Sequence, residues 1–320
     1  MKKRTISIII LLAIVLIISI FVIDYMSKRP DRMKANPYAY DVEEYTHVDP
    51  KLINYRETRN FPIEGYKPTG IDVAGGKIWI CGSGVLQVIL PEGVQVLKTE
   101  IGENSSCIKV DGEDVFVGFE DHVEKFNGRG ERLETWDNPG RNCVFTSVSC
   151  DDTHVFVADA GNRRVLVYDR DGSLKGEFAG ASESAAGHGF IIPSANFDLA
   201  ADQTGKVWVV NPGKHAIEYY DSEGEMITFW QNSSMEIDGF TGCCNPAEID
   251  MLPNGDFVTS EKGMVRIKIY SDRGKMKSVV APPGKFEEEV HAPEVSVDED
   301  GTIYALDFDR NMIRVFQKTD

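Results

Sequence analysis

The chain lacks the short motifs that mark several large enzyme classes. It contains no nucleophile elbow, no P-loop, no dinucleotide-binding glycine fingerprint and no His-Glu-x-x-His pair. These patterns respectively supply an activated serine, a phosphate cradle, a pyrophosphate turn and two zinc ligands on one helix face. Their absence argues against the hydrolases, nucleotide enzymes and metalloproteases that depend on them.

Basic residues are also in short supply. The chain has 34 Lys and Arg against 51 Asp and Glu, which gives a formal net charge of −17. A field of this sign repels phosphate backbones and anionic lipid heads, and it attracts cations and basic partners. We therefore expect no nucleic-acid partner, although much of this charge also serves to keep a surface soluble.

A module recurs along the chain: a short apolar strand, a Gly or Asp turn, a second strand ending in an acid or amide, a third strand and another Gly turn. The clearest copy covers residues 145–172, further copies cover 193–224 and 246–274, and fainter ones begin at Pro68, Ser105 and Pro293. Six copies can be counted. Internal repetition at this spacing is a stronger indication of fold than any single motif.

The repeats predict an all-β, six-bladed β-propeller over residues 52–320. Short strands with period-two alternation, joined by Gly turns and repeated about every 40 to 50 residues, are typical of propeller blades. A β-sandwich is the alternative, but a sandwich has no reason to repeat at this period. Blades that share interfaces in a ring count as one domain.

The last repeat lacks an outer strand, because the sequence ends at Asp320 shortly after its third strand. Residues 52–62 are strand-like and belong to no repeat of their own. We expect this segment to complete the sixth blade, since closing the ring removes an exposed sheet edge.

The N-terminus carries an apolar run over residues 6–23, preceded by Lys2, Lys3 and Arg4. The run is long for a cleavable signal peptide and lacks a small-residue cleavage site, so it predicts an uncleaved transmembrane helix. We expect a membrane anchor at 1–26, a tether at 27–51 and a single-pass protein of the cell membrane. The basic residues before the run predict a cytoplasmic N-terminus and an extracytoplasmic propeller, although the basic residues at 28–34 reduce this charge asymmetry.

Residues 155–172 carry a family resemblance. The segment Val155-Phe-Val-Ala-Asp-Ala-Gly-Asn162-Arg-Arg-Val165 resembles an NHL repeat, whose family forms six-bladed propellers. The resemblance covers residues 52–320, weakly in the first two repeats. It implies fold more than function, because such propellers include protein- and RNA-binding modules as well as lyases and lactonases. Asp159 and Asn162 themselves are expected to satisfy backbone groups at a tight turn.

Most of the six cysteines map to the face that carries the connections between blades. Cys143, Cys244 and His291 each stand two residues before the expected first strand of a blade, so they should converge on the mouth of the channel, with Cys107 and Cys243 nearby. Sulfur and imidazole suit a transition metal. Disulfides and buried free thiols remain open as alternatives.

Two long connections, at 179–192 and 231–245, lie on the same face and are candidate binding loops. His188, His215 and Phe240 are the candidate contact residues. Glu248 and Glu294 begin first strands, and a lactonase-like propeller would use such carboxylates to hold calcium in the channel.

The sequence thus favours a membrane-tethered, extracytoplasmic propeller that binds a protein or a small-molecule ligand on its loop-rich face. The alternative is a metal-dependent enzyme or redox protein, lyase- or lactonase-like, with a Cys/His site at the channel mouth.

Overall fold

The computed structural model describes residues 2–27, 45–180, 189–202, 204–286 and 291–319. The chain divides into two units, 1–44 and 45–320. In the first unit, helix α1 spans Lys2–Ser27, with side chains described from Leu11 to Tyr25. Within this described part of the chain, no helix is both long and apolar enough to cross a membrane, and the predicted transmembrane helix is therefore not confirmed.

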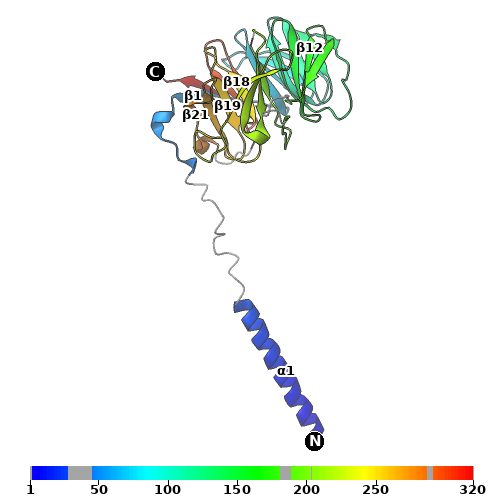
Figure 1. Cartoon of the computed structure of the whole chain (residues 1–320), viewed down its shortest axis with the longest axis vertical. Helices are drawn as coiled ribbons and strands as arrows, with labels where there is room; N and C mark the ends of the chain where they lie inside the picture. The colour runs from blue at the N-terminus through cyan, green and yellow to red at the C-terminus, as the bar shows by residue number, and fades with distance from the viewer. Residues whose placement is uncertain (1, 28–44, 181–188, 203, 287–290, 320) are drawn as a thin grey trace. The chain divides into compact units, whose positions relative to one another are not determined.

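The second unit confirms the predicted all-β six-bladed propeller, which consists of six antiparallel four-stranded sheets (Figure 1). The first blade has strands β2 (Pro68–Ala74), β3 (Lys77–Gly82), β4 (Val85–Ile89) and β5 (Gln95–Glu100). The second has β6 (Ser105–Asp111), β7 (Asp114–Phe119), β8 (Val123–Asn127) and β9 (Arg132–Thr135). The third has β10 (Phe145–Cys150), β11 (His154–Asp159), β12 (Arg164–Asp169) and β13 (Leu174–Phe178).

The fourth blade has β14 (Leu199–Ala201), β15 (Val207–Asn211), β16 (Ala216–Tyr220) and β17 (Met226–Gln231). The fifth has β18 (Glu248–Met251), β19 (Phe257–Glu261), β20 (Arg266–Tyr270) and β21 (Met276–Ala281). The sixth has β22 (Glu294–Val297), β23 (Ile303–Asp307), β24 (Met312–Lys318) and β1 (Tyr55–Pro62). Three short 3-10 helices lie at Pro50–Leu52, Pro212–Lys214 and Pro283–Lys285.

The first strands of the blades contact one another in a closed ring, in the order β2, β6, β10, β14, β18, β22 and back to β2. They line the central channel, and the later strands of each blade lie further out. Between neighbouring blades lie separate apolar clusters; one joins Ile78 and Ile80 of the first blade to Leu306 and Ile313 of the sixth. The alternation of apolar residues in the second and third strands thus supplies both faces of each buried blade.

The turn after the second strand carries the polar residue that defines the repeat. Asp159 is fully buried, and its Oδ1 accepts hydrogen bonds from the backbone N–H groups of Val144 and Asn162. Its Oδ2 accepts from the Asn162 amide at 2.7 Å and from Arg164 Nε at 2.9 Å. This carboxylate therefore fixes its own turn and the incoming connection between blades, as expected for a structural residue.

The sixth blade is completed from the other end of the propeller, where β1 pairs antiparallel with β24 (Figure 1). A charged contact accompanies the pairing: Glu57 Oε2 lies 2.8 Å from Arg314 Nη2. Although partial burial opposes ionisation of Glu57, the Arg314 guanidinium holds the pKa of this carboxyl below its usual range. Arg314 itself is buried and lies over the ring of Phe286.

Replacing Glu57 by Gln should therefore destabilise the protein at pH 7 by about 1 to 2 kcal/mol, because Arg314 would keep its buried charge without this anionic partner. The loss should shrink as the pH falls through the lowered pKa of Glu57, where the wild-type carboxyl is protonated too. Thermal unfolding of the full chain at pH 7 and pH 3 measures both effects. Arg56→Gln, an exposed change on the same strand, is the control, and equal effects of the two substitutions would contradict the assignment.

Candidate functional site: an acidic channel mouth

The ring of first strands is held by side chains that reach from one blade to the backbone of the next. Asp72 Oδ2 accepts from the Val110 N–H at 2.7 Å, and Asp198 Oδ2 accepts from the Ile249 N–H at 2.6 Å. The same pattern is repeated by three further pairs, which are Ser149 with Ala201, Asp250 with Val297, and Ser296 with Val73. Backbone donors that face the channel would otherwise lack partners.

These contacts draw acidic side chains into the channel. Asp72, Asp198, Glu248, Asp250 and Glu294 all come from first strands or the residues just before them. In the described part of the channel their main positive counterpart is Lys109, whose Nζ lies 3.1 Å from Asp72 Oδ1. Although burial opposes the charge of Lys109, Asp72 and Asp250 hold the pKa of its ammonium above the usual value.

A cavity of about 700 Å³ opens at the end of the channel where the first strands begin. Every blade contributes to its wall, and one residue from each is Thr69, Ser106, Thr146, Asn196, Glu248 and Glu294. The wall combines hydroxyl, amide and carboxylate oxygens with the apolar rings of Phe145 and Phe308. A concave surface with a few convergent polar groups is the usual form of a small-molecule site.

The carboxyl groups at this mouth bind protons unusually tightly. Burial raises the pKa of Asp198 to about 6, and burial together with the nearby charge of Asp198 raises the pKa of Glu248 and of Glu294 well above their usual range. Interaction with the Asn196 side chain partly offsets this rise for Glu248. The ionisation of Asp198 therefore opposes that of Glu248, because two anions close together in a poorly solvated site repel each other.

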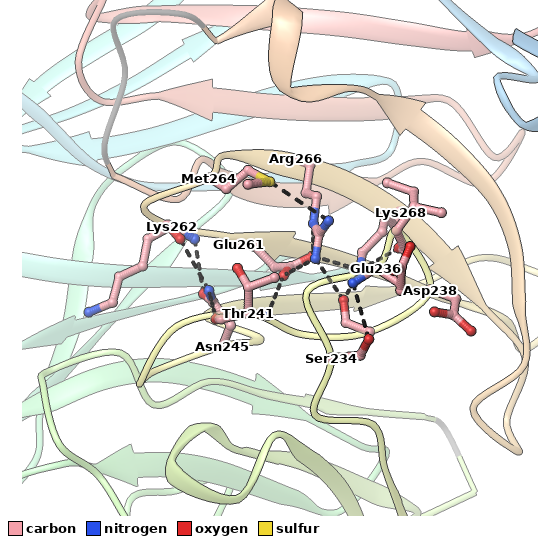
Figure 2. Close-up of polar contacts among 12 residues, drawn as sticks. Ser234, Glu236, Asp238, Thr241, Asn245, Glu261, Lys262, Met264, Arg266 and Lys268 are labelled. Atoms are coloured by element: carbon pink, nitrogen blue, oxygen red, sulfur yellow. Dashed lines mark hydrogen bonds and ion pairs between the residues drawn. The ribbon is translucent and has the colours of Figure 1, made fainter. Parts of the chain in front are cut away.

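The loop at 232–245 is fixed by a buried ion cluster in the fifth blade (Figure 2). Glu261, Arg266 and Lys268 have fully buried side chains, with Glu261 Oε1 lying 2.8 Å from Arg266 Nε and 2.7 Å from Lys268 Nζ. Both cations also donate to the carbonyl of Gly239, at 2.8 and 2.6 Å. Burial lowers the pKa of Lys268 to about 8, against the opposing influence of Glu261.

Phe240 belongs to this fixed loop. The sequence predicts it as a candidate contact residue on the surface, but its side chain is buried. It is 1% exposed and packs against Trp230 and Tyr270. The Phe240 ring also holds the loop in place, because the Lys268 Nζ lies over it, 4.9 Å from the ring centroid. His215 is half-buried at a turn with positive φ, and its Nδ1 has no hydrogen-bond partner in the described structure. His188 lies outside the described residues.

The three predicted metal ligands have separate surroundings. Cys143 packs in the cluster with Trp136 and Phe145, between the second and third blades. Cys244 lies 3.1 Å, Sγ to Sγ, from Cys243. His291 lines the channel-mouth cavity, where its Nδ1 lies 2.6 Å from Asp309 Oδ1.

The spacing that suggested convergence holds only in part. Cys143 precedes β10 by two residues, but β18 begins four residues after Cys244 and β22 three residues after His291. Cys107 is buried beside β7, with its Sγ close to Gly118. All six cysteines are free thiols, and among the described residues no group of three His, Cys, Asp or Glu side chains is placed to hold a metal ion. The structure thus brings together carboxylates at the mouth, with His291 beside them, and leaves the cysteines elsewhere.

The fold and this site define the class of protein: a six-bladed β-propeller with an acidic pocket at one end of its channel. No protein-family model and no curated protein matches the chain, so the resemblance to NHL repeats has no support from sequence comparison. Solved structures match through the fold.

The chain is similar to virginiamycin B lyase from Staphylococcus aureus, with 13% identity and a TM-score of 0.52 over 82% of this chain and 99% of that one. A streptogramin B lyase structure has 10% identity and a TM-score of 0.52, covering 83% of this chain and 98% of the other. A Bacteroides thetaiotaomicron protein of unknown function has 12% identity and a TM-score of 0.59, covering 82% and 75%. At this identity the likeness shows the propeller fold alone.

The raised carboxyl pKa values predict how stability depends on pH. A carboxyl whose pKa is higher in the folded than in the unfolded protein stabilises the fold at low pH, and this contribution is lost as the pH rises through the folded-state pKa. Asp198 and Asp250 lose this stabilising contribution between about pH 4 and about pH 6, and Glu248 loses it over a range that extends to higher pH. Glu248→Gln supplies a permanently neutral group that can still donate to Asp198.

The melting temperature of Glu248→Gln should therefore exceed that of the wild type at pH 8, by about 2 to 4 °C for each kcal/mol gained, and should differ little at pH 5. Glu64→Gln, an exposed change, should shift neither value. A variant less stable than the wild type at pH 8 would show that Glu248 is ionised and well solvated in the native state.

Proposed function

We propose that the protein binds a small, positively charged organic ligand at the mouth of its propeller channel. The observation that carries the proposal is the pair of carboxyl groups, Glu248 and Glu294, in the wall of an open cavity of about 700 Å³ to which all six blades contribute. The buried carboxyl of Asp198 lies near enough to both to raise their pKa values. The cavity is much larger than a metal ion needs. Its carboxylates favour an amine or guanidine, and Phe145 and Phe308 offer apolar contact to the ligand body.

The raised pKa values of the carboxyl groups at the site support a cationic ligand. An ammonium group placed among these carboxyls would compensate their negative charge and allow Glu248 to ionise. Affinity for a cation should then rise with pH through the range in which the carboxyls release their protons. A neutral ligand would show no such dependence.

Putrescine and butanediol form a matched pair of probes, because they share a four-carbon chain and differ in charge. Putrescine should raise the melting temperature of the full chain at pH 8, and less so at pH 5, while butanediol should have no effect. The double variant Glu248→Gln, Glu294→Gln should lower putrescine affinity about tenfold or more. Glu64→Gln should bind like the wild type.

Equal stabilisation by both probes, or an unchanged putrescine affinity in the double variant, would exclude this site as a cation site.

Acid–base catalysis on the same ligand is the second candidate function. The raised pKa values of Asp198 and Glu248 favour it, because two neighbouring carboxyls of which one stays protonated are a common arrangement of a general acid and base. The lyase named among the structural neighbours is compatible with such chemistry but shares only the fold with this chain. Turnover of a bound ligand, lost in Glu248→Gln, would distinguish catalysis from binding.

We further propose that the N-terminal segment anchors the propeller at the extracytoplasmic side of the cell membrane. Residues 6–23 are almost uninterruptedly apolar, and the described side chains of α1, among them Leu12, Leu16 and Phe21, are exposed all round the helix. A helix that is apolar on every face needs a nonpolar environment.

Alkaline carbonate extraction tests this anchor. The full chain should stay in the membrane pellet, whereas a variant with Leu12, Leu16 and Ile20 changed to Lys should appear in the supernatant. Protease added to intact spheroplasts should digest the wild-type propeller. Extraction of the wild type, or protection of its propeller, would contradict the anchor or its orientation respectively.

A further inference from the structure

Cys243 and Cys244 form a pair of adjacent thiols at the surface. Their sulfur atoms are 3.1 Å apart. Cys243 is exposed, while Cys244 is 2% exposed. One sulfur can therefore be reached by a molecule in solution, and the other lies directly behind it.

The surroundings of Cys244 favour its thiolate. Burial opposes the charge, but hydrogen bonds from Ser194, Cys243 and Lys262 and the positive charge of Lys262 hold the pKa of this thiol below its usual value. Lys262 is fixed in place, because its Nζ also donates to Ser194 Oγ at 2.8 Å and to Asn196 Oδ1 at 2.9 Å. Thiolate beside an immobilised ammonium is the arrangement that makes a cysteine reactive.

The other four cysteines have the opposite environment. Cys81, Cys107, Cys143 and Cys150 are buried. Burial raises the pKa of Cys81 to about 12 and that of Cys150 to about 11, and it raises the values of Cys107 and Cys143 as well. A protonated, inaccessible thiol is inert, so reactivity is confined to the adjacent pair.

The backbone around the pair is held from both sides. Asn245 donates from its side-chain amide to the carbonyls of Thr241 and Lys262, at 2.6 and 3.1 Å, and accepts from the Lys262 N–H. The Thr241 N–H in turn donates to buried Glu261. Figure 2 shows Thr241, Asn245, Glu261 and Lys262, which form this frame. The backbone that carries the two thiols is therefore fixed on both sides.

We propose that Cys243 and Cys244 are a redox-active dithiol that forms a reversible disulfide by exchange with a small-molecule disulfide. The hydrogen bond to Cys244 raises the pKa of the Cys243 thiol, so Cys243 first passes its proton to the neighbouring Cys244 thiolate. The exposed Cys243 sulfur then attacks one sulfur of the incoming disulfide and expels its other half, which takes that proton from Cys244 and leaves as a thiol, so that a mixed disulfide remains on Cys243. The thiolate of Cys244 then attacks the Cys243 sulfur and expels the second half. The two cysteines lose two electrons in total, and the small disulfide is reduced to two thiols.

Geometry makes this disulfide easy to reduce again. Neighbouring Cα atoms are about 3.8 Å apart across a trans peptide, whereas most disulfides join Cα atoms about 4.4 to 6.8 Å apart. The bond therefore forms under strain, and strained, exposed disulfides are the labile ones. The pair is suited to switching and poorly suited to permanent bracing.

Glutathione disulfide is the probe for the test, applied to the reduced full chain. Trypsin releases both cysteines in the peptide 215–262, which contains no other cysteine. Mass spectrometry should show this peptide lighter by two hydrogen atoms after exposure, restored by reduced glutathione, while the remaining cysteines stay alkylatable after denaturation. In Cys244→Ser, the reaction should stop at a glutathione adduct on Cys243.

The Lys262→Gln variant tests whether the Lys262 ammonium activates the Cys244 thiol or whether the two thiols react only because they are close together. Loss of the ammonium should slow closure of the disulfide about fivefold to tenfold at pH 7 and much less at pH 9, because the thiolate then forms without help. Lys275→Gln, an exposed change on the same blade, should leave the rate unchanged. Two free thiols in the wild-type peptide at equilibrium with glutathione disulfide, or a stable adduct in place of the internal bond, would overturn the proposal.

Discussion

The structure depends on the hydrogen bonds that pass from the first strand of one blade to the backbone of the next. A propeller exposes backbone donors to its channel, and water there is confined. Asp72, Asp198 and Asp250 satisfy three of these donors with carboxylate oxygens. The same side chains that close the ring therefore concentrate negative charge at its centre, and the proposed binding site follows from this requirement.

The long loop of the fifth blade shows a related use of charge. Glu261 occupies the place that Asp159 has in the third blade, but it is paired with two buried cations, and their remaining donors bind loop carbonyls. Burying an unequal number of opposite charges is expensive unless every donor is satisfied. The loop supplies the missing acceptors, and this explains why a long surface connection is well fixed and why Phe240 lies inside it.

Sequence patterns located the repeats, and the number and type of blades are confirmed because strand alternation and turn glycines act locally. The role of Asp159 was predictable for the same reason, since its partners lie within or next to its own turn. It is harder to predict from sequence which side chains meet at the channel mouth. This depends on where each first strand begins, and β14 begins at Leu199, well after the repeat alignment indicates. The sequence alone points to the cysteines and histidines because of their ligand chemistry, and it does not single out Asp72, Asp198 and Asp250. One sequence feature indicates the acidic channel: acids at alternate positions of a first strand, as in Glu248 and Asp250, lie on the same face of that strand.

The pairing of β1 with β24 determines when the propeller can close during synthesis. Glu57 leaves the ribosome before the first blade, and its partner Arg314 follows only after five blades have been made. Until then β1 is a strand without a neighbour, and the growing ring is an open arc. Charges at Arg56, Glu57 and Arg59 make that waiting strand a poor template for pairing with other nascent chains. The ring can thus close only once β24 has been made, and until then the polarity of β1 limits its pairing with other chains.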